Sequence, residues 1–325
     1  MSTAIFSAIE SGFIYAIMAL GVYLSFRILD FPDLTVDGSF VTGAAVAAVL
    51  IVNGTNPFLA SAVALLVGFV AGSVTGILHT KGKINPLLSG ILMMIALYSI
   101  NLRIMGRSNV PLLQQDTVMT AMTEAWQKAG LDEAINGIFS FSGFVPRTWA
   151  IFVTMALVAI VIKLLLDQLL KTEIGLALRA TGDNKQMVSS FSANTDWLTI
   201  FGLGLSNALV AFSGALVAQY GGFSDVGMGI GMIVIGLASV IIGEALFGAR
   251  TIARATLAVI GGAIVYRIIL ALALRVKFLE TGDVKLITAV IVMIALIVPN
   301  MIAAQKEKRR KKRKAQERGE HVASA

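Results

Sequence analysis

Long apolar runs separated by short polar segments make up most of the 325-residue chain. Two further apolar stretches, 41–52 and 221–250, are short or interrupted by glycine. The runs that are long enough to cross a bilayer as helices, at about 20 residues each, are 5–26, 58–78, 84–104, 150–170, 198–219, 255–274 and 284–302. The pattern predicts an all-α, polytopic transmembrane helical bundle of roughly 8–10 membrane segments, some of them broken or re-entrant.

The composition supports a membrane protein. Hydrophobic residues make up 57% of the chain and only 14% of the residues are charged, against roughly a quarter in soluble domains. Much of the positive charge lies in 306–318, directly after the last apolar run. Basic clusters beside a membrane span set topology and contact anionic lipid. We therefore expect a membrane domain, 1–304, and a basic cytoplasmic tail, 305–325, that contacts membrane lipid and binds no nucleic acid.

The loops between the apolar runs predict the orientation of the chain. If the basic tail is cytoplasmic, alternate crossings place the basic segments 79–83, 171–197 and 248–254 inside and the polar segment 106–148 outside. Counting every apolar run as one crossing puts the N-terminus outside. An inside N-terminus requires one re-entrant or split segment, and 27–52 is the first candidate for it.

The segment 171–197 is the one long charged interruption in the second half of the chain. Within it, Gly-Asp-Asn at 182–184 predicts a turn that caps a short helix ending near Phe191, because Asp and Asn side chains accept hydrogen bonds from free backbone N–H groups at helix starts. On this evidence alone, the segment is equally well interpreted as an ordinary connector between two spans.

Two segments combine carboxylates with residues that interrupt helices. Pro32 disfavours a helix within 27–38, and several glycines interrupt 221–250. Irregular backbone is tolerated at membrane depth where it lines a watery cavity, and broken segments in the two halves of a transporter point to its central site. We therefore expect 30–38 and 222–236 to converge, the alternative being two unrelated aqueous loops. The predicted translocation-pathway residues are Asp30, Asp33, Asp37, Asp225 and Gly229.

The remaining charged residues, and the residue types that the chain lacks, argue against several classes of functional site. Arg267 lies within an apolar run and requires a partner or water, for which Glu244 is the nearest candidate by sequence. The chain has no cysteine, so it has no disulfide and no thiolate metal site. It also lacks a G-x-x-x-x-G-K-[ST] phosphate-binding loop, so any ATP hydrolysis must occur on another chain. We expect no catalytic residue, no metal and no cofactor, and therefore no enzyme.

The segment 171–197 resembles the permease family of bacterial ABC importers for branched-chain amino acids and simple sugars. The matching residues are Gly175, Arg179, Ala180, Gly182, Asn184, Met187 and Ser190, followed by the small-residue run 201–218. The resemblance extends with lower specificity to 29–45 and 221–250. In that family the equivalent loop is a coupling helix, which lies in a groove of the ATP-hydrolysing subunit.

The resemblance implies a protein of the bacterial cell (inner) membrane with a cytoplasmic C-terminus. Its implied partners are a second permease copy in a homodimer, separate ATP-hydrolysing subunits, and an extracytoplasmic substrate-binding protein that docks beside 106–148. The ATPase-coupling residues implied in this way are Arg179, Gly182, Asp183, Asn184, Met187 and Ser190.

The implied function is that of a permease subunit forming the solute pathway of an ABC importer. The overall pattern is closest to amino-acid importers, in particular a branch linked to aromatic amino acids. The alternatives are a permease for a sugar or nucleoside, and a secondary transporter coupled to protons or sodium. The ion site of such a secondary transporter would consist of Asp30, Asp33, Asp37, Glu244 and Arg267.

Overall fold

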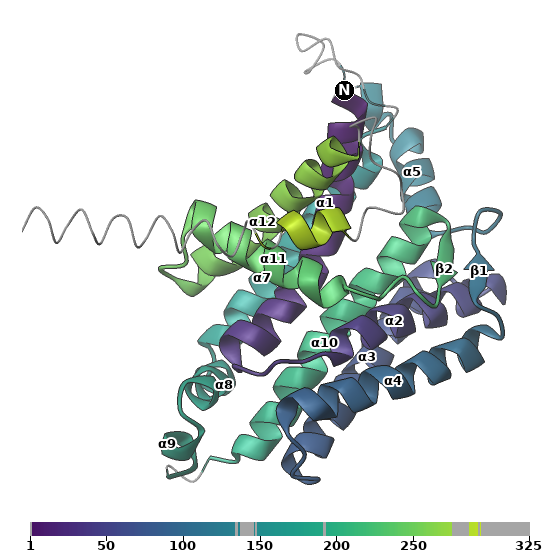
Figure 1. Cartoon of the computed structure of the whole chain (residues 1–325). Coiled ribbons are helices and arrows are strands. Elements are labelled where there is room, and N and C mark those ends of the chain that lie inside the picture. The colour runs from purple at the N-terminus through teal and green to yellow at the C-terminus, as the bar shows by residue number, and fades with distance from the viewer. Residues whose placement is uncertain are drawn as a thin grey trace, which may run out of the picture.

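The computed structural model is a helical bundle (Figure 1) that describes residues 2–133, 136, 146, 148–190, 193–274, 286–291 and 293. Seven helices in the described part of the chain are long and apolar enough to cross a membrane. They are α1 (Ser2–Tyr23) with its π-helical extension η1 (Leu24–Ile28), α2 (Thr35–Val52), α3 (Pro57–Thr80), α4 (Pro86–Met105), α7 (Ala150–Lys171), α10 (Thr195–Gly221) and α12 (Ile252–Ala273). The predicted all-α polytopic bundle is therefore confirmed.

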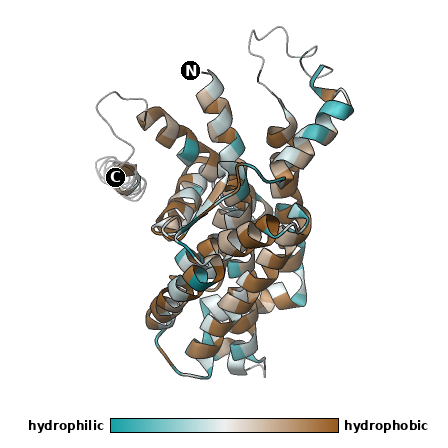
Figure 2. Cartoon of the chain, turned by 90° about the vertical axis from the view of Figure 1, so that its right-hand side faces the viewer, coloured by the Kyte–Doolittle hydropathy of each residue, from teal (hydrophilic) through white to brown (hydrophobic). Residues whose placement is uncertain are grey.

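Shorter elements connect these long helices. They are α5 (Val118–Lys128), α8 (Glu173–Asp183), α9 (Lys185–Ser190), the apolar α11 (Met232–Phe247), and the strands β1 (Asn109–Pro111) and β2 (Phe223–Asp225). Figure 2 shows hydrophobic residues along the long helices and hydrophilic residues mainly in the turns and at helix ends. Most of the predicted run 284–302 and all of the tail 305–325 lie outside the described residues.

Two long helices begin where the sequence places Asn before Pro. The side chains of Asn56 and Asn85 accept hydrogen bonds from the N–H groups of Phe58 and Leu87, at 2.9 and 3.0 Å. The proline that follows each asparagine is the first helical residue, where its missing N–H costs nothing and its fixed φ favours the helix. Local chemistry therefore sets the starts of α3 and α4.

Helix α10 is the central helix of the bundle and packs against α1, α2 and α3 (Figure 1). Small residues allow the backbones to approach closely. A methyl group at Gly43 of α2 would overlap the carbonyl oxygen of Ala211, and one at Gly214 of α10 would overlap that of Phe40. Membrane helices associate through such close packing because lipid supplies no hydrophobic driving force between them.

Hydrogen bonds across the helices add to this packing. The hydroxyl groups of Ser206 and Ser213 on α10 donate to the carbonyl oxygens of Gly21 and Ile14 on α1, at 2.7 and 2.8 Å. Both serines are fully buried. The small-residue run 201–218 therefore contacts α1 as well as α2 and α3.

Arg267 does not pair with Glu244, its nearest candidate by sequence. The guanidinium group of Arg267 lies 4.3 Å from the centre of the Tyr15 ring, and its Nε donates to Ser11 Oγ at 3.1 Å. The packing of α11 against α12 explains this, because Gly243, the neighbour of Glu244, meets Ala258. Arg267 lies more than two turns further along α12. In this antiparallel pair the residues opposite Glu244 lie near the turn that joins the two helices, whereas Arg267 lies further from that turn.

Replacing Gly214 by alanine should destabilise the protein, because the new methyl group overlaps the Phe40 carbonyl oxygen. Overpacking of this kind costs about 1–3 kcal/mol. We expect a lower midpoint of thermal unfolding in detergent. Gly221→Ala in the last turn of the same helix is the matched control, since a methyl group there meets only the Phe223 ring at 3.8 Å. Equal midpoints for the two variants would contradict the close contact of α2 with α10.

Candidate functional site

The backbone is irregular between α1 and α2, as the sequence predicts. Residues 29–34 form no regular helix, and Asp30 adopts a left-handed conformation with φ 49°. Helix α2 begins at Thr35, whose N–H donates to Asp33 Oδ1 at 2.9 Å. The helix therefore starts earlier than the apolar run 41–52 indicates, because a side-chain acceptor holds the N–H at its first residue.

Asp33 also ties this break to the central helix. Its carboxylate is fully buried, and Asn207 Nδ2 of α10 donates to its Oδ2 at 2.6 Å. Next to it, the hydroxyl groups of Thr35 and Thr75 are 2.8 Å apart. Asp33 therefore fixes the position of the break within the bundle, whereas Asp30 is exposed.

Asp37 joins the two broken segments. Its Oδ2 accepts a hydrogen bond from the Gly231 N–H at 2.9 Å, and its Oδ1 accepts one from the Ile233 N–H at 2.8 Å. These N–H groups belong to the start of α11, where a negative charge is also favoured by the helix dipole. Gly229 lies so close that a methyl group there would overlap the Asp37 carbonyl oxygen. The segments 30–38 and 222–236 thus converge, as the sequence predicts.

The second broken segment is also tied to the predicted extracytoplasmic loop. Strand β2 pairs antiparallel with β1, so that Val110 lies opposite Ser224. Asp225 at the end of β2 accepts the Gly227 N–H at 2.8 Å and starts the turns that lead to α11. The interruption of this apolar run is therefore a strand and a series of turns followed by a short helix.

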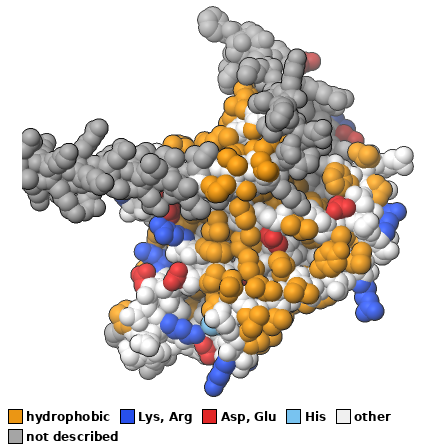
Figure 3. All heavy atoms as spheres, viewed as in Figure 1, with side chains coloured by type: hydrophobic (Ala, Val, Ile, Leu, Met, Phe, Trp, Pro, Cys, Tyr) orange, Lys and Arg blue, Asp and Glu red, His pale blue; other side chains and the backbone are white. Residues whose placement is uncertain are grey.

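A cavity of about 500 Å³ lies where these segments meet α4. This volume is within the range of small-molecule sites. The lining residues are Asp37, Gly38, Val41, Met94, Ile95, Tyr98, Ser99, Asn101, Val226, Gly229 and Ile230. The front face of the molecule is largely hydrophobic, with an acidic group near its centre (Figure 3). Of the predicted pathway residues, Asp37 and Gly229 line the cavity, whereas Asp30, Asp33 and Asp225 do not.

Asn101 is a residue of this cavity that the sequence analysis missed. Its Nδ2 donates to the Gly38 carbonyl oxygen at 3.2 Å, whereas its buried Oδ1 has no hydrogen-bond partner within the described residues. A buried acceptor without a partner is costly, so packing alone does not explain an asparagine at this position. The available signal was an asparagine near the end of the apolar run 84–104.

The ion site that the alternative function, a secondary transporter, would require does not form. Its residues would be Asp30, Asp33, Asp37, Glu244 and Arg267. Asp33 instead bonds to Asn207, and Arg267 lies over the Tyr15 ring. Glu244 accepts hydrogen bonds from Nε and Nη2 of Arg27, at 3.0 and 3.1 Å. These groups are dispersed along the bundle and do not share one site.

The segment 171–197 contains two helices. Gly182 and Asp183 are the last residues of α8, and Asn184 is extended, so the turn predicted at 182–184 is reduced to a break at Asn184. Gly182 contacts the end of η1, where a methyl group would overlap the Ile28 carbonyl oxygen, and this contact explains the glycine. The predicted cap at Asn184 is confirmed, because its Oδ1 accepts the Met187 N–H of α9 at 3.0 Å.

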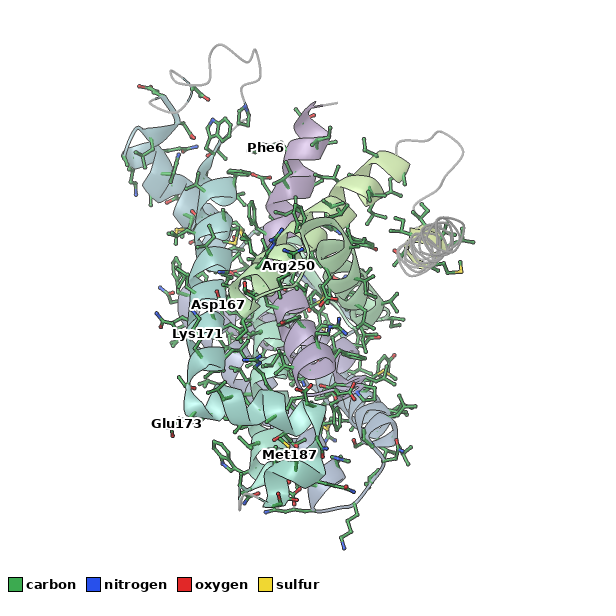
Figure 4. The ribbon with its side chains drawn as sticks, turned by 90° about the vertical axis from the view of Figure 1, so that its left-hand side faces the viewer. Phe6, Asp167, Lys171, Glu173, Met187 and Arg250 are labelled. Atoms are coloured by element: carbon green, nitrogen blue, oxygen red, sulfur yellow. The ribbon has the colours of Figure 1, made fainter. Side chains whose placement is uncertain are left out.

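The six residues assigned to ATPase coupling lie in two places. Met187 is half exposed on α9, near Glu173 at the end of the molecule opposite Phe6 (Figure 4). Ser190 is exposed on the same helix. Arg179 and Asp183 of α8 instead line a second cavity, of about 620 Å³. This cavity lies beside the Arg27–Glu244 ion pair, which joins the end of α1 to the last turn of α11.

Comparison with known proteins identifies the family. The family model described as branched-chain amino acid transport system, permease component, matches residues 4–298. The chain is 44% identical to the tyrosine transport system permease protein of Clostridioides difficile (strain R20291), over 92% of each protein. It is 36% identical to an uncharacterized protein of Rickettsia prowazekii (strain Madrid E), over 74% of this chain and 77% of that protein.

A third relative is a LivH branched-chain amino acid transport permease of Methanocaldococcus jannaschii, 26% identical over 64% of this chain and 65% of its own. The family match covers most of the chain, and the first relative matches over nearly its whole length. The resemblance seen in the sequence is thereby confirmed. The chain belongs to the branched-chain amino acid permease family and is a membrane-embedded transport subunit of an ABC transporter.

Proposed function

We propose that this chain forms the pathway through which an ABC importer takes up an aromatic amino acid, with tyrosine as its substrate. The observation that carries the proposal is the 44% identity to a tyrosine transport system permease over 92% of both proteins. Conservation of sequence over the full length favours a shared substrate class more than a match confined to one loop would.

The cavity at the convergence of the broken segments supports an aromatic amino acid. Met94, Ile95 and Tyr98 give it an apolar and aromatic wall, against which a tyrosine ring packs favourably. Ser99 and Asn101 add polar groups to the same lining. Both oxygens of Asp37 already accept hydrogen bonds from backbone N–H groups. Asp37 therefore shapes the cavity, and the other lining residues contact the substrate.

Permeases of this family act with ATP-hydrolysing and substrate-binding subunits. In our proposal, two copies of the chain enclose one pathway, and the binding protein docks on the outer side, near β1 and α5. The ATPase contacts α8 and α9 on the cytoplasmic side, with Met187 and Ser190 at the contact and Asn184 holding the start of α9. The exposed Met187 side chain supports this contact.

A continuous set of contacts supports transmission from α8 to the cavity. Gly182 of α8 packs on the Ile28 carbonyl, and the neighbouring Arg27 holds Glu244 through two hydrogen bonds. Glu244 lies in the last turn of α11, and Asp37 binds the first turn of that helix. A shift of α8 driven by the ATPase would therefore move the end of α1 and α11 together, and α11 would change the cavity.

The substrate is tested by uptake into vesicles that contain the permease with its ATPase and binding protein. We expect uptake of labelled L-tyrosine that requires ATP and that excess L-phenylalanine lowers by competition. Excess ribose should have no effect. No tyrosine uptake, or competition by ribose, would show that the substrate assignment is wrong.

The pathway is tested with single cysteines, because the natural chain has none. Val226→Cys and Ile230→Cys place a thiol beside the cavity. We expect their rates of reaction with a small aqueous thiol reagent to change when ATP and loaded binding protein are added. Asn53→Cys is the control: Asn53 is exposed in the turn after α2 and lies outside this cavity, so ATP should not change its reactivity. State-independent reactivity at 226 and 230 would rule out a pathway there.

Charge reversal tests the link between Arg27 and Glu244. Arg27→Glu and Glu244→Arg each place like charges together, so each should slow coupled transport. Residues in a coupling network typically contribute about 0.5–2 kcal/mol, which corresponds to roughly a two- to thirtyfold change in rate. The double variant restores opposite charges and should recover uptake. Lys81→Glu, in the exposed turn after α3, is the control for charge alone. A double variant as slow as the single variants would exclude the ion pair from transmission.

A further inference from the structure

The 620 Å³ cavity beside α8 carries charges of both signs. Three arginines line it, Arg27, Arg179 and Arg250, together with two carboxylates, Asp183 and Glu244. They come from the end of α1, from α8, from the last turn of α11 and from the residues before α12. The cavity therefore collects charged groups from four elements at the predicted cytoplasmic end of the bundle.

Only part of this charge is neutralised within the cavity. Arg27 and Glu244 bind each other. Across the part of the chain that the structure describes, Arg179, Arg250 and Asp183 form no ion pair and no side-chain hydrogen bond. Arg179 and Asp183 are four residues apart on α8, so they share one face of that helix. A guanidinium group and a carboxylate group are thus left available side by side, with a second guanidinium at Arg250.

These groups match the two charges of a free α-amino acid. Guanidinium groups bind carboxylates through paired hydrogen bonds, and a carboxylate is the natural partner of an ammonium group. The remaining wall includes Tyr23, Ile28 and Ile252, which suit an apolar or aromatic side chain. The volume is within the range of small-molecule sites.

We propose that this cavity binds a cytoplasmic amino acid of the transported class and that its binding slows import. The inference rests on the proposed function for its choice of ligand. An amino acid held by Arg179, Asp183 and Arg250 would bridge α8 to the segment before α12. Because α8 must shift for transport to proceed, a ligand that binds one position of α8 more tightly biases the protein toward that position. The cavity would then act as a product-inhibition site.

The test uses vesicles that contain the assembled transporter, with ATP and either no amino acid or saturating unlabelled L-tyrosine inside. We expect internal tyrosine to lower the initial rate of external tyrosine uptake about fivefold or more, the range of typical coupling between two sites. Arg250→Gln should abolish this inhibition and leave uptake without internal tyrosine unchanged. Lys81→Gln, which removes an exposed charge from the turn after α3, should keep the inhibition.

Analogues inside the vesicles identify the chemistry of the site. Tyramine lacks the carboxylate and N-acetyl-L-tyrosine lacks the ammonium group, so neither should inhibit, and inorganic phosphate should not inhibit either. Inhibition by phosphate or by N-acetyl-L-tyrosine would indicate a simple anion site and overturn the proposal. Inhibition that persists in Arg250→Gln would place the internal tyrosine in the pathway itself and would also overturn it.

The remaining outcomes separate this inference from the proposed function. If the vesicles take up no tyrosine, the proposed substrate is wrong, and with it the ligand inferred here. If they take up tyrosine at a rate that internal tyrosine does not change, only the inhibition site is wrong. If Arg250→Gln slows uptake in vesicles with anionic lipid but not in vesicles without it, the cavity holds a lipid headgroup and the amino-acid proposal fails.

Discussion

Each backbone N–H group at membrane depth needs an acceptor inside the protein, and the broken segments of this permease are arranged around that requirement. An interrupted helix exposes the N–H groups at the start of the next helix. Asp33 accepts the N–H of Thr35 at the start of α2, and Asp37 accepts those of Gly231 and Ile233 at the start of α11. The chain can therefore be irregular in two places because its own carboxylates satisfy the free donors.

The same requirement makes the two breaks depend on each other. Asp37 lies in the first turn of α2, so the position of α2 determines where the start of α11 can be held. The absence of a side chain at Gly229 lets the backbone before α11 pack directly on the Asp37 carbonyl. Behind this junction, small residues on α2 and α10 bring the two helices into contact, and Asn207 of α10 binds Asp33. A movement of α11 would therefore change the shape of the cavity, whereas α10 supports the junction from behind.

Features that depend on the local pattern of residues could be predicted from the sequence. Features that depend on how two helices align in three dimensions could not. Apolar runs gave the long helices, and the cap at Asn184 followed from its side-chain chemistry. The partner of Arg267 depends on how α11 and α12 align, and sequence distance carries no such information. Gly182 suggested a turn, but it serves close packing against Ile28 inside a helix. The place of Asn101 in the cavity could not be predicted, because the sequence of an apolar run does not show which side of the helix a polar residue faces.

The Arg27–Glu244 ion pair is weak, and that weakness suits the coupling role that we propose for it. The Arg27 side chain is 62% exposed, and exposed pairs contribute only about 0–1 kcal/mol to stability because water and salt screen them. Such a pair is unsuited to holding the fold together, a role that the buried packing around α10 already fills. It is suited to a joint that must open and re-form in each cycle, since little free energy is needed to break it. The two parallel hydrogen bonds of the guanidinium group fix the orientation of the end of α11 relative to the end of α1 while the pair is made.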